Sequence, residues 1–180
     1  MKTFIVDLYE YFKLPRGENA GGKLTVLLHE NSPEINVERK YPAMLVLPGG
    51  GYAFCSDREA EPIAEAYYAE GFNAYILRYS VAPVSVYPTQ LCEAAMAMAY
   101  IRREAKAQFT DPAHVAAIGF SAGGHLCGSI ATMYAREPVK DLGISPVEAR
   151  TDAAVLSYAV ISHGINDVGT AGSLKNLTAG

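Results

Sequence analysis

The chain has 180 residues, of which half are apolar and 19% are charged, and its formal net charge at pH 7 is −4. This length and apolar content predict one globular domain, residues 1–180, with a substantial core, and they argue against a disordered chain. The negative charge, without any basic block, argues against nucleic acid and anionic membrane surfaces as partners. No apolar run approaches the ~20 residues of a transmembrane helix.

The N-terminus and the cysteines indicate where the protein works. The first residues hold one lysine and reach Asp7 too early for a signal-peptide core, so we expect a cytoplasmic protein, unless a leader has been removed. Cys55, Cys92 and Cys127 have no metal or redox spacing, and their odd number fits a reducing compartment. Cys92 and Cys127 fall within helical patterns and are predicted to be small core residues.

The predicted elements alternate between strands and helices. In chain order they are strands at residues 4–12, 23–30 and 41–47, a helix at 61–71, a strand at 72–79, a helix at 88–108, a strand at 114–118, a helix at 124–136 and a strand at 153–161. Residues 56–59 resemble a capping box, and residues 137–151 read as a polar linker. This alternation predicts an α/β fold, with a mostly parallel sheet covered by helices on both faces.

The segment Gly119–Gly124 joins a predicted strand to a predicted helix and has the sequence Gly-Phe-Ser-Ala-Gly-Gly. A serine with glycines two residues before and after it is typical of a nucleophile elbow, because larger side chains would collide in so tight a turn. Such a turn places the Ser121 hydroxyl at the end of the sheet, beside the N-terminal N–H groups of the helix. The alternative is a glycine-rich turn that contains an incidental serine.

The segment Pro48–Tyr52 follows the predicted strand at residues 41–47 and contains three successive glycines. A triple-glycine loop after an early strand is typical of an oxyanion hole, which here would combine the backbone N–H of Ala122 with those of Gly50 and Gly51. A phosphate-binding loop is the alternative, but the Gly-Lys-Ser/Thr ending of a P-loop is absent. Both motifs follow strand carboxyl ends, where ligands bind in such sheets, so together they predict an acyl-transfer site.

From about Tyr41 onward the chain resembles the α/β-hydrolase fold, most closely small esterases of the acetyl-xylan and feruloyl esterase type. The resemblance is carried by the two glycine motifs together with residues 56–64, 71–74, 79–83 and 125–126. It implies a three-layer sandwich, Ser121 as nucleophile, Ala122 with Gly50 or Gly51 as oxyanion donors, and Tyr52 close to the bound acyl group. It implies neither a metal nor an organic cofactor.

The sequence departs from this family in its final third. The family's triad runs in the order serine, acid, histidine, with the acid after a seventh strand and the histidine after an eighth. This chain ends just beyond its predicted sixth strand. We therefore expect an incomplete domain that lacks the last strands, with the triad acid and histidine beyond Gly180.

The histidines and acids that are present do not fill this gap well. His125 lies one turn after Ser121 on the same helix and is expected to line a pocket or to serve structure. His163 is the histidine most easily imagined near the site, and Asp167 lies on the same side without an evident histidine to orient. Asp152 precedes its strand at the wrong end. Ordinary strand-edge or rim roles are expected for the rest, namely His29, His114, Asp57, Arg58 and Glu59.

Three functions remain open from the sequence. The first is a serine esterase that hydrolyses short acyl esters, such as acetyl or feruloyl esters of carbohydrates, through an acyl-enzyme on Ser121. The second is a catalytically incomplete interaction module, whose unpaired sheet edge we expect to be buried by a homodimer or in another way. The third is a peptidase related to prolyl oligopeptidases, which is less favoured because Phe120 stands where those enzymes usually have tryptophan.

Overall fold

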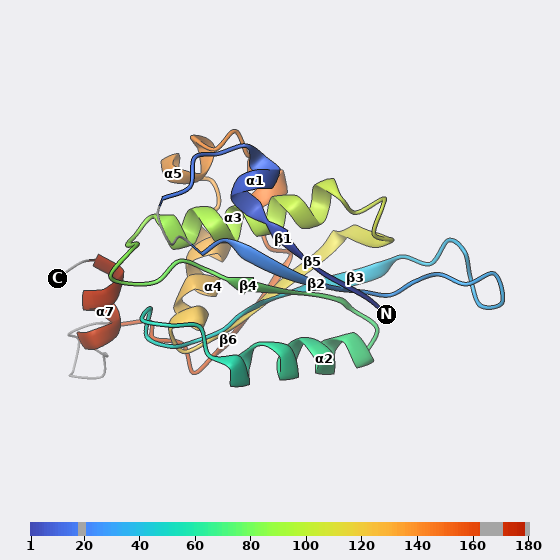
Figure 1. The fold of residues 1–180 in the computed structure, drawn as a ribbon, viewed down its shortest axis with the longest axis horizontal. Coiled ribbons are helices and arrows are strands. Elements are labelled where there is room, and N and C mark those ends of the chain that lie inside the picture. Colours follow the sequence, from blue (N-terminus) through green and yellow to red (C-terminus); the bar gives the residue numbers. More distant parts are fainter. Residues whose placement is uncertain (18–20, 163–170, 179–180) are drawn as a thin grey trace.

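The computed structural model describes residues 1–17, 21–162 and 171–178, and within these ranges six strands form one sheet (Figure 1). The strands are β1 (Lys2–Asp7), β2 (Lys23–Leu28), β3 (Tyr41–Leu47), β4 (Asn73–Arg78), β5 (Thr110–Phe120) and β6 (Ala153–Ser157). Their order across the sheet is β1-β2-β4-β3-β5-β6. The pairs β1–β2 and β2–β4 are antiparallel and the other three pairs are parallel, which confirms the mostly parallel sheet.

Helices cover both faces of the sheet. The helices are α1 (Leu8–Phe12), α2 (Glu61–Ala69), α3 (Thr89–Arg103), α4 (Ala122–Met133), α5 (Glu137–Lys140), α6 (Pro146–Ala149) and α7 (Ala171–Thr178), with a 3-10 turn, η1, at Asp57–Glu59. In Figure 1 α2 lies below the sheet, whereas α1, α3 and α5 lie above it. The central strand β3 is buried on both faces, with Leu45 in the core under α3 and Val46 in the core under α2.

The strand predicted at residues 4–12 is correct only in its first half. The Asp7 carboxylate accepts hydrogen bonds from the N–H groups of Tyr9 and Glu10, and this N-cap begins α1 directly after β1. The apolar side chains that follow have a spacing that fits a strand and a short helix equally well. The Asp7 cap stabilises the helix, and the spacing of the apolar residues does not predict this interaction.

The capping box predicted at residues 56–59 is wrong, because Ser56 makes no side-chain capping bond and η1 forms there. Helix α2 begins at Glu61 with Pro62 in its first turn and is followed by Gly71 at φ 90°, as the sequence predicts. The predicted linker at residues 137–151 contains α5 and α6, and the long helix after Pro88 ends at Arg103 instead of reaching residue 108. Helix α7 was not predicted.

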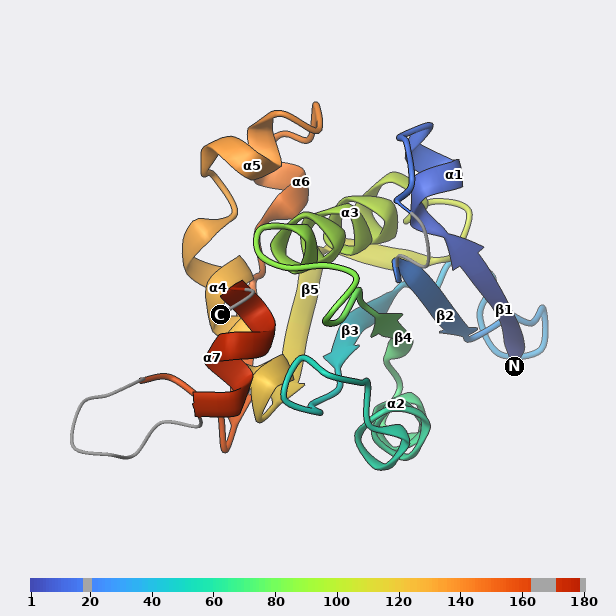
Figure 2. The same ribbon diagram turned by 60° about the vertical axis from the view of Figure 1, so that its left-hand side comes forward.

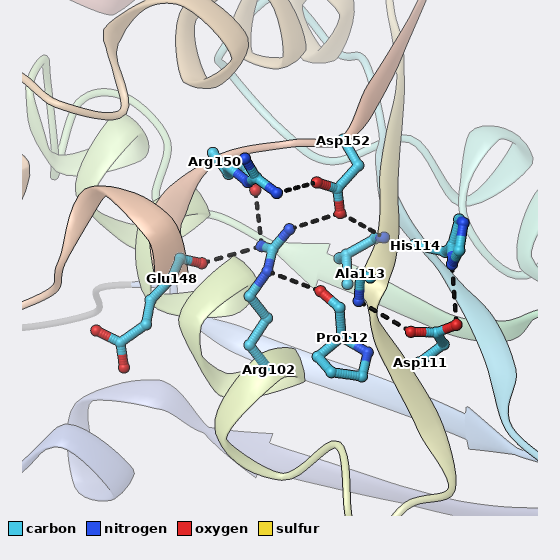
Figure 3. Close-up of polar contacts among 9 residues, drawn as sticks. Arg102, Asp111, Pro112, Ala113, His114, Glu148, Arg150 and Asp152 are labelled. Atoms are coloured by element: carbon cyan, nitrogen blue, oxygen red, sulfur yellow. Dashed lines mark hydrogen bonds and ion pairs between the residues drawn. The ribbon is translucent and has the colours of Figure 1, made fainter.

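The amino ends of β5 and β6 are held together by the guanidinium of Arg102 on α3 (Figure 3). It donates hydrogen bonds to the backbone carbonyls of Pro112, Glu148 and Arg150, and its Nη2 lies 2.8 Å from Asp152 Oδ2. The same carboxylate oxygen accepts the N–H of Val115. Arg102 therefore joins α3, β5 and the segment that carries α6 into β6.

The carboxyl end of β4 is tied to α3 by Glu93, whose side chain is fully buried. Glu93 Oε2 accepts the N–H of Ser80 at 2.6 Å, and Oε1 accepts the hydroxyl of Tyr9 at 2.8 Å. Burial raises the pKa of the Glu93 carboxyl above 4.5 despite these donors. One buried carboxyl thus joins α3, α1 and the segment after β4.

This buried carboxyl predicts a pH dependence of stability. The folded state holds the Glu93 proton more tightly than the unfolded state does. The contribution of Glu93 to the free energy of unfolding therefore falls as the pH rises from about 4.5 through the folded-state pKa of Glu93. Glu93→Gln keeps an acceptor for Ser80 and does not titrate. Urea unfolding at several pH values between about 4.5 and 8 should therefore show the variant gaining stability relative to the wild type as pH rises. A constant difference across this range would contradict the prediction.

The outer edge of the described sheet at β6 is apolar and open to solvent. Val155 and Leu156 are each 43% exposed, and within the described residues β6 pairs only with β5. This agrees with the expected apolar edge. The homodimer that would bury it stays a prediction.

Candidate active site

Ser121 lies between β5 and α4 with φ 50° and ψ −116°, a left-handed conformation that non-glycine residues rarely adopt. The turn depends on the glycines beside it. A methyl group on Gly119 would lie 2.1 Å from the carbonyl oxygen of Gly123, and one on Gly123 would lie 2.1 Å from that of Leu47. The turn is therefore as tight as the glycine spacing predicts.

The glycine loop after β3 is pressed against this turn. Leu47 pairs with Gly119 in the parallel register, so both motifs leave the sheet at the same level. A methyl group on Gly49 would lie 2.7 Å from the carbonyl oxygen of Phe120 and 3.1 Å from Ser121 Cβ. Figure 2 shows the loop after β3 beside the start of α4, as the register requires.

Among the described residues, the glycine loop forms hydrogen bonds through its carbonyls but not through all of its N–H groups. The carbonyls of Pro48, Gly49 and Gly50 accept the Tyr79 hydroxyl and the N–H groups of Ser56 and Ala53. By contrast, the N–H groups of Gly50, Gly51 and Ala122 donate no hydrogen bond to any residue that the structure describes. N–H groups in a turn and at a helix N-terminus can bind an oxyanion, and this role for the three groups stays a prediction.

Tyr52 follows the three glycines of the loop, and its side chain is buried beneath them in the core. Its backbone is also left-handed, with φ 59°, and its side chain is 2% exposed. The Tyr52 hydroxyl lies 2.8 Å from Nδ1 of His125, and burial raises the pKa of this hydroxyl. The bond joins the glycine loop to α4, and it gives His125 the structural contact that the sequence suggests. Substrate binding by Tyr52 stays a prediction, and its hydroxyl is already engaged.

The other candidate acids and bases either lie outside the described residues or lie at the end of the sheet opposite Ser121. His163 and Asp167 lie outside the described residues. Asp152 lies at the amino end of β6, where it contacts Arg102, and His114 lies at the same end of the sheet beside Asp111 (Figure 3). His29 is stacked between Tyr41 and Tyr68, with centroid distances of 4.5 and 3.9 Å, and burial lowers its pKa.

Two contacts of the glycine loop were not found from the sequence. The carboxylate of Glu59 accepts the N–H of Gly49 at 2.8 Å and the hydroxyl of Tyr158 at 2.6 Å. Helix α7 lies beside the loop (Figure 2), and the Asn176 side chain donates to the carbonyl of Gly51 at 2.9 Å. The motifs do not reveal these contacts, because the paired residues lie between 10 and 125 positions apart in the chain.

The cysteine thiols of the chain are not activated as nucleophiles. Burial raises the pKa of each cysteine thiol to about 11, so none is a ready thiolate. In the ranges that the structure describes, no three His, Cys, Asp or Glu side chains are grouped to hold a metal ion. Nor does any helix in those ranges have both the length and the apolar character to cross a bilayer.

A model of the family described as BD-FAE matches residues 32–174, which include both glycine motifs. The chain belongs to the BD-FAE family. This confirms the predicted resemblance to α/β-hydrolases of the carbohydrate-esterase type. A solved α/β-hydrolase, MGS-M1 from a deep-sea metagenome library of the Medee basin, is 39% identical with a TM-score of 0.74, over 91% of this chain and 60% of that one.

Other relatives and solved structures have related names. The chain is 36% identical to Endo-1,4-beta-xylanase B of Butyrivibrio fibrisolvens, over 72% of this chain and 21% of that protein. It is 30% identical to an acetylxylan esterase of Xylanibacter ruminicola, over 67% of this chain and 23% of that protein. An acetyl ester-xyloside bifunctional hydrolase of Caldicellulosiruptor lactoaceticus is 31% identical with a TM-score of 0.71, over 86% of this chain and 54% of that one.

The chain spans only part of the length of these relatives. The matched region is less than a third of each of the two curated relatives and 54–60% of the two solved structures. The likeness to MGS-M1 confirms the α/β-hydrolase fold of the present chain.

Proposed function

We propose that this chain carries the nucleophile and oxyanion hole of a serine carboxylesterase. The observation that carries the proposal is the position of Ser121, held in a left-handed turn against a glycine loop in which the N–H groups of Gly50 and Gly51 donate no hydrogen bond to any described residue. A reactive hydroxyl and several donors at one point are what acyl transfer requires. The BD-FAE match over residues 32–174 supports the same reading.

In the proposed reaction, Ser121 Oγ attacks the ester carbonyl and gives its proton to a histidine. The carbonyl oxygen becomes an oxyanion that accepts hydrogen bonds from the N–H groups of Gly50, Gly51 and Ala122. The protonated histidine then gives its proton to the departing alcohol, which leaves an acyl group on Ser121. Water attacks this ester, the same histidine again takes and returns a proton, and the acid is released.

The histidine must be supplied from outside the described residues. His29 and His114 lie at the far end of the sheet from Ser121, and Nδ1 of His125 is bonded to the Tyr52 hydroxyl. The resemblance implies this histidine beyond Gly180, and for turnover by residues 1–180 alone we assign the base to His163 or to a partner chain. For the substrate we propose short acyl esters of carbohydrates, because relatives are named an acetylxylan esterase and an acetyl ester-xyloside hydrolase.

Hydrolysis of p-nitrophenyl acetate by the purified chain tests this function. Multiple turnovers are expected for the wild type, and Ser121→Ala should lose them. A site without its nucleophile retains only about a 10³–10⁴-fold rate enhancement over water. Ser129→Ala is the matched control, since its hydroxyl lies on the same helix and donates to the His125 carbonyl. Equal rates for wild type and Ser121→Ala would contradict the proposal, and faster cleavage of proline peptides than of esters would favour a peptidase.

A further inference from the structure

The peptide unit between Pro48 and Gly49 is held at both of its polar ends. Its carbonyl oxygen accepts the Tyr79 hydroxyl at 2.6 Å, and its N–H donates to Glu59 Oε2 at 2.8 Å. The Tyr79 side chain is 2% exposed, and burial raises the pKa of its hydroxyl, so this donor stays protonated. Because a peptide unit is planar, fixing both ends fixes the orientation of the whole plane.

This peptide unit lies against the turn that carries the nucleophile and immediately precedes the proposed oxyanion donors in the chain. A methyl group on Gly49 would be 2.6 Å from Glu59 Oε2 and 3.1 Å from Ser121 Cβ, so carboxylate, loop and nucleophile meet around one Cα atom. The next peptide unit along the chain carries the N–H of Gly50. Any rotation of the Pro48–Gly49 unit would therefore turn that N–H relative to Ser121.

The second oxygen of Glu59 extends the contact to the other side of the turn. Oε1 accepts the hydroxyl of Tyr158, which follows β6 and has a left-handed backbone with φ 36°. The Tyr158 ring also packs on Phe120, with 5.8 Å between centroids. Since β5 lies between β3 and β6, Glu59 bridges the segments that leave the two strands flanking the nucleophile strand.

We propose that Glu59 is a positioning residue of the esterase site, which orients the N–H groups of Gly50 and Gly51 toward the oxyanion formed at Ser121. The inference rests on the function proposed above and adds a residue outside both glycine motifs. Oxyanion donors act only when they lie 2.7–3.1 Å from the developing charge, and small misplacements cost large factors in rate. A carboxylate is suited to this task because it accepts two hydrogen bonds on separate oxygens.

Three variants separate positioning from charge and from simple stability. Glu59→Ala removes both acceptors. Glu59→Gln removes the charge but keeps an acceptor for the Gly49 N–H and an NH2 group for the Tyr158 oxygen. Asp57→Ala is the matched control, because Asp57 lies in the same turn and pairs with Arg78 instead of the loop.

With p-nitrophenyl acetate, Glu59→Ala should lower kcat by about 10- to 100-fold, with KM and Tm close to the wild type, because a misaligned donor weakens only the transition state. Glu59→Gln should recover most of this loss, and Asp57→Ala should have little effect. A Glu59→Ala variant with wild-type kcat, or a Glu59→Gln variant as slow as Glu59→Ala, would overturn the proposal.

A second measurement keeps this inference distinct from the proposed function. In ¹⁵N NMR relaxation of the full chain, the backbone order parameters of Gly49, Gly50 and Gly51 should be lower in Glu59→Ala than in the wild type, in Asp57→Ala and in Glu59→Gln. If the wild type shows no turnover that depends on Ser121, the proposed function fails, and the amide order alone then decides the role of Glu59 in holding the loop. Unchanged amide order in Glu59→Ala would overturn it.

Discussion

Replacement of Gly123 by alanine is expected to lower the free energy of unfolding by about 3 kcal/mol or more, because it forces a methyl group into a packed core. The new Cβ would lie 2.1 Å from the carbonyl oxygen of Leu47 and 2.4 Å from that of Pro48. Both are backbone atoms at the end of β3, so no side-chain rotation can relieve the clash. The helix α4 and the glycine loop must separate, and urea unfolding measures the cost.

Gly128→Ala on the same helix is the control. A methyl group there would meet Leu156 Cδ2 at 3.2 Å, the far end of a flexible side chain on the edge strand. Alanine also favours a helix interior over glycine by about 1 kcal/mol, so this variant should be neutral or slightly more stable. Equal destabilisation of the two variants would show that the close approach at Gly123 does not determine the stability of the turn.

Replacement of Arg102 by methionine is expected to lower the free energy of unfolding by about 3 kcal/mol, because it removes a buried cation that pairs with Asp152 and leaves only Arg150, at 3.1 Å, as an ion-pair partner of that carboxylate. The Arg102 and Asp152 side chains are only 8% and 19% exposed. Burial lowers the pKa of the guanidinium, while Asp152 opposes this effect, so the charged pair is held in a poorly solvated place. Three backbone carbonyls also lose their donor.

Two controls accompany this variant. Arg103→Met removes a more exposed ion pair to Glu148 and should cost under about 1 kcal/mol. The double variant Arg102→Met with Asp152→Asn should be less destabilised than the sum of the single variants, because the two side chains contact each other and the Asp152 charge is removed together with Arg102. Strict additivity in urea unfolding would contradict the buried-pair explanation.

The sheet could be predicted wherever the sequence pattern is dictated by burial on both faces. The strands β3 and β4 are near-continuous apolar runs, and only a buried strand of a parallel sheet needs that composition. The strand β5 begins before the predicted residue 114, because Pro112–His114 are exposed and lie in an irregularity of the register between the pairs Tyr41–Thr110 and Ala43–Val115. The predictions failed where one side-chain bond decides the structure, as with the Asp7 cap of α1.

The candidate site could also be predicted only in part. The positions of Ser121 and the glycine loop follow from steric demands that act within a few residues, so the spacing of the glycines discloses them. The partners of the loop come from other parts of the chain, and a single sequence does not pair distant residues. Glu59 is predicted as a rim residue, and only the structure shows its hydrogen bond to Gly49.

The register that pairs Leu47 with Gly119 also bears on how the protein folds. The two halves of the site are far apart in the chain, and only the parallel pairing of β3 with β5 brings them together. Contacts between distant segments form slowly, because the intervening chain must lose its freedom before they are made. A folding intermediate that had formed α2, β4 and α3 alone would therefore contain neither the elbow nor its donors, and the site would be completed only with the central sheet.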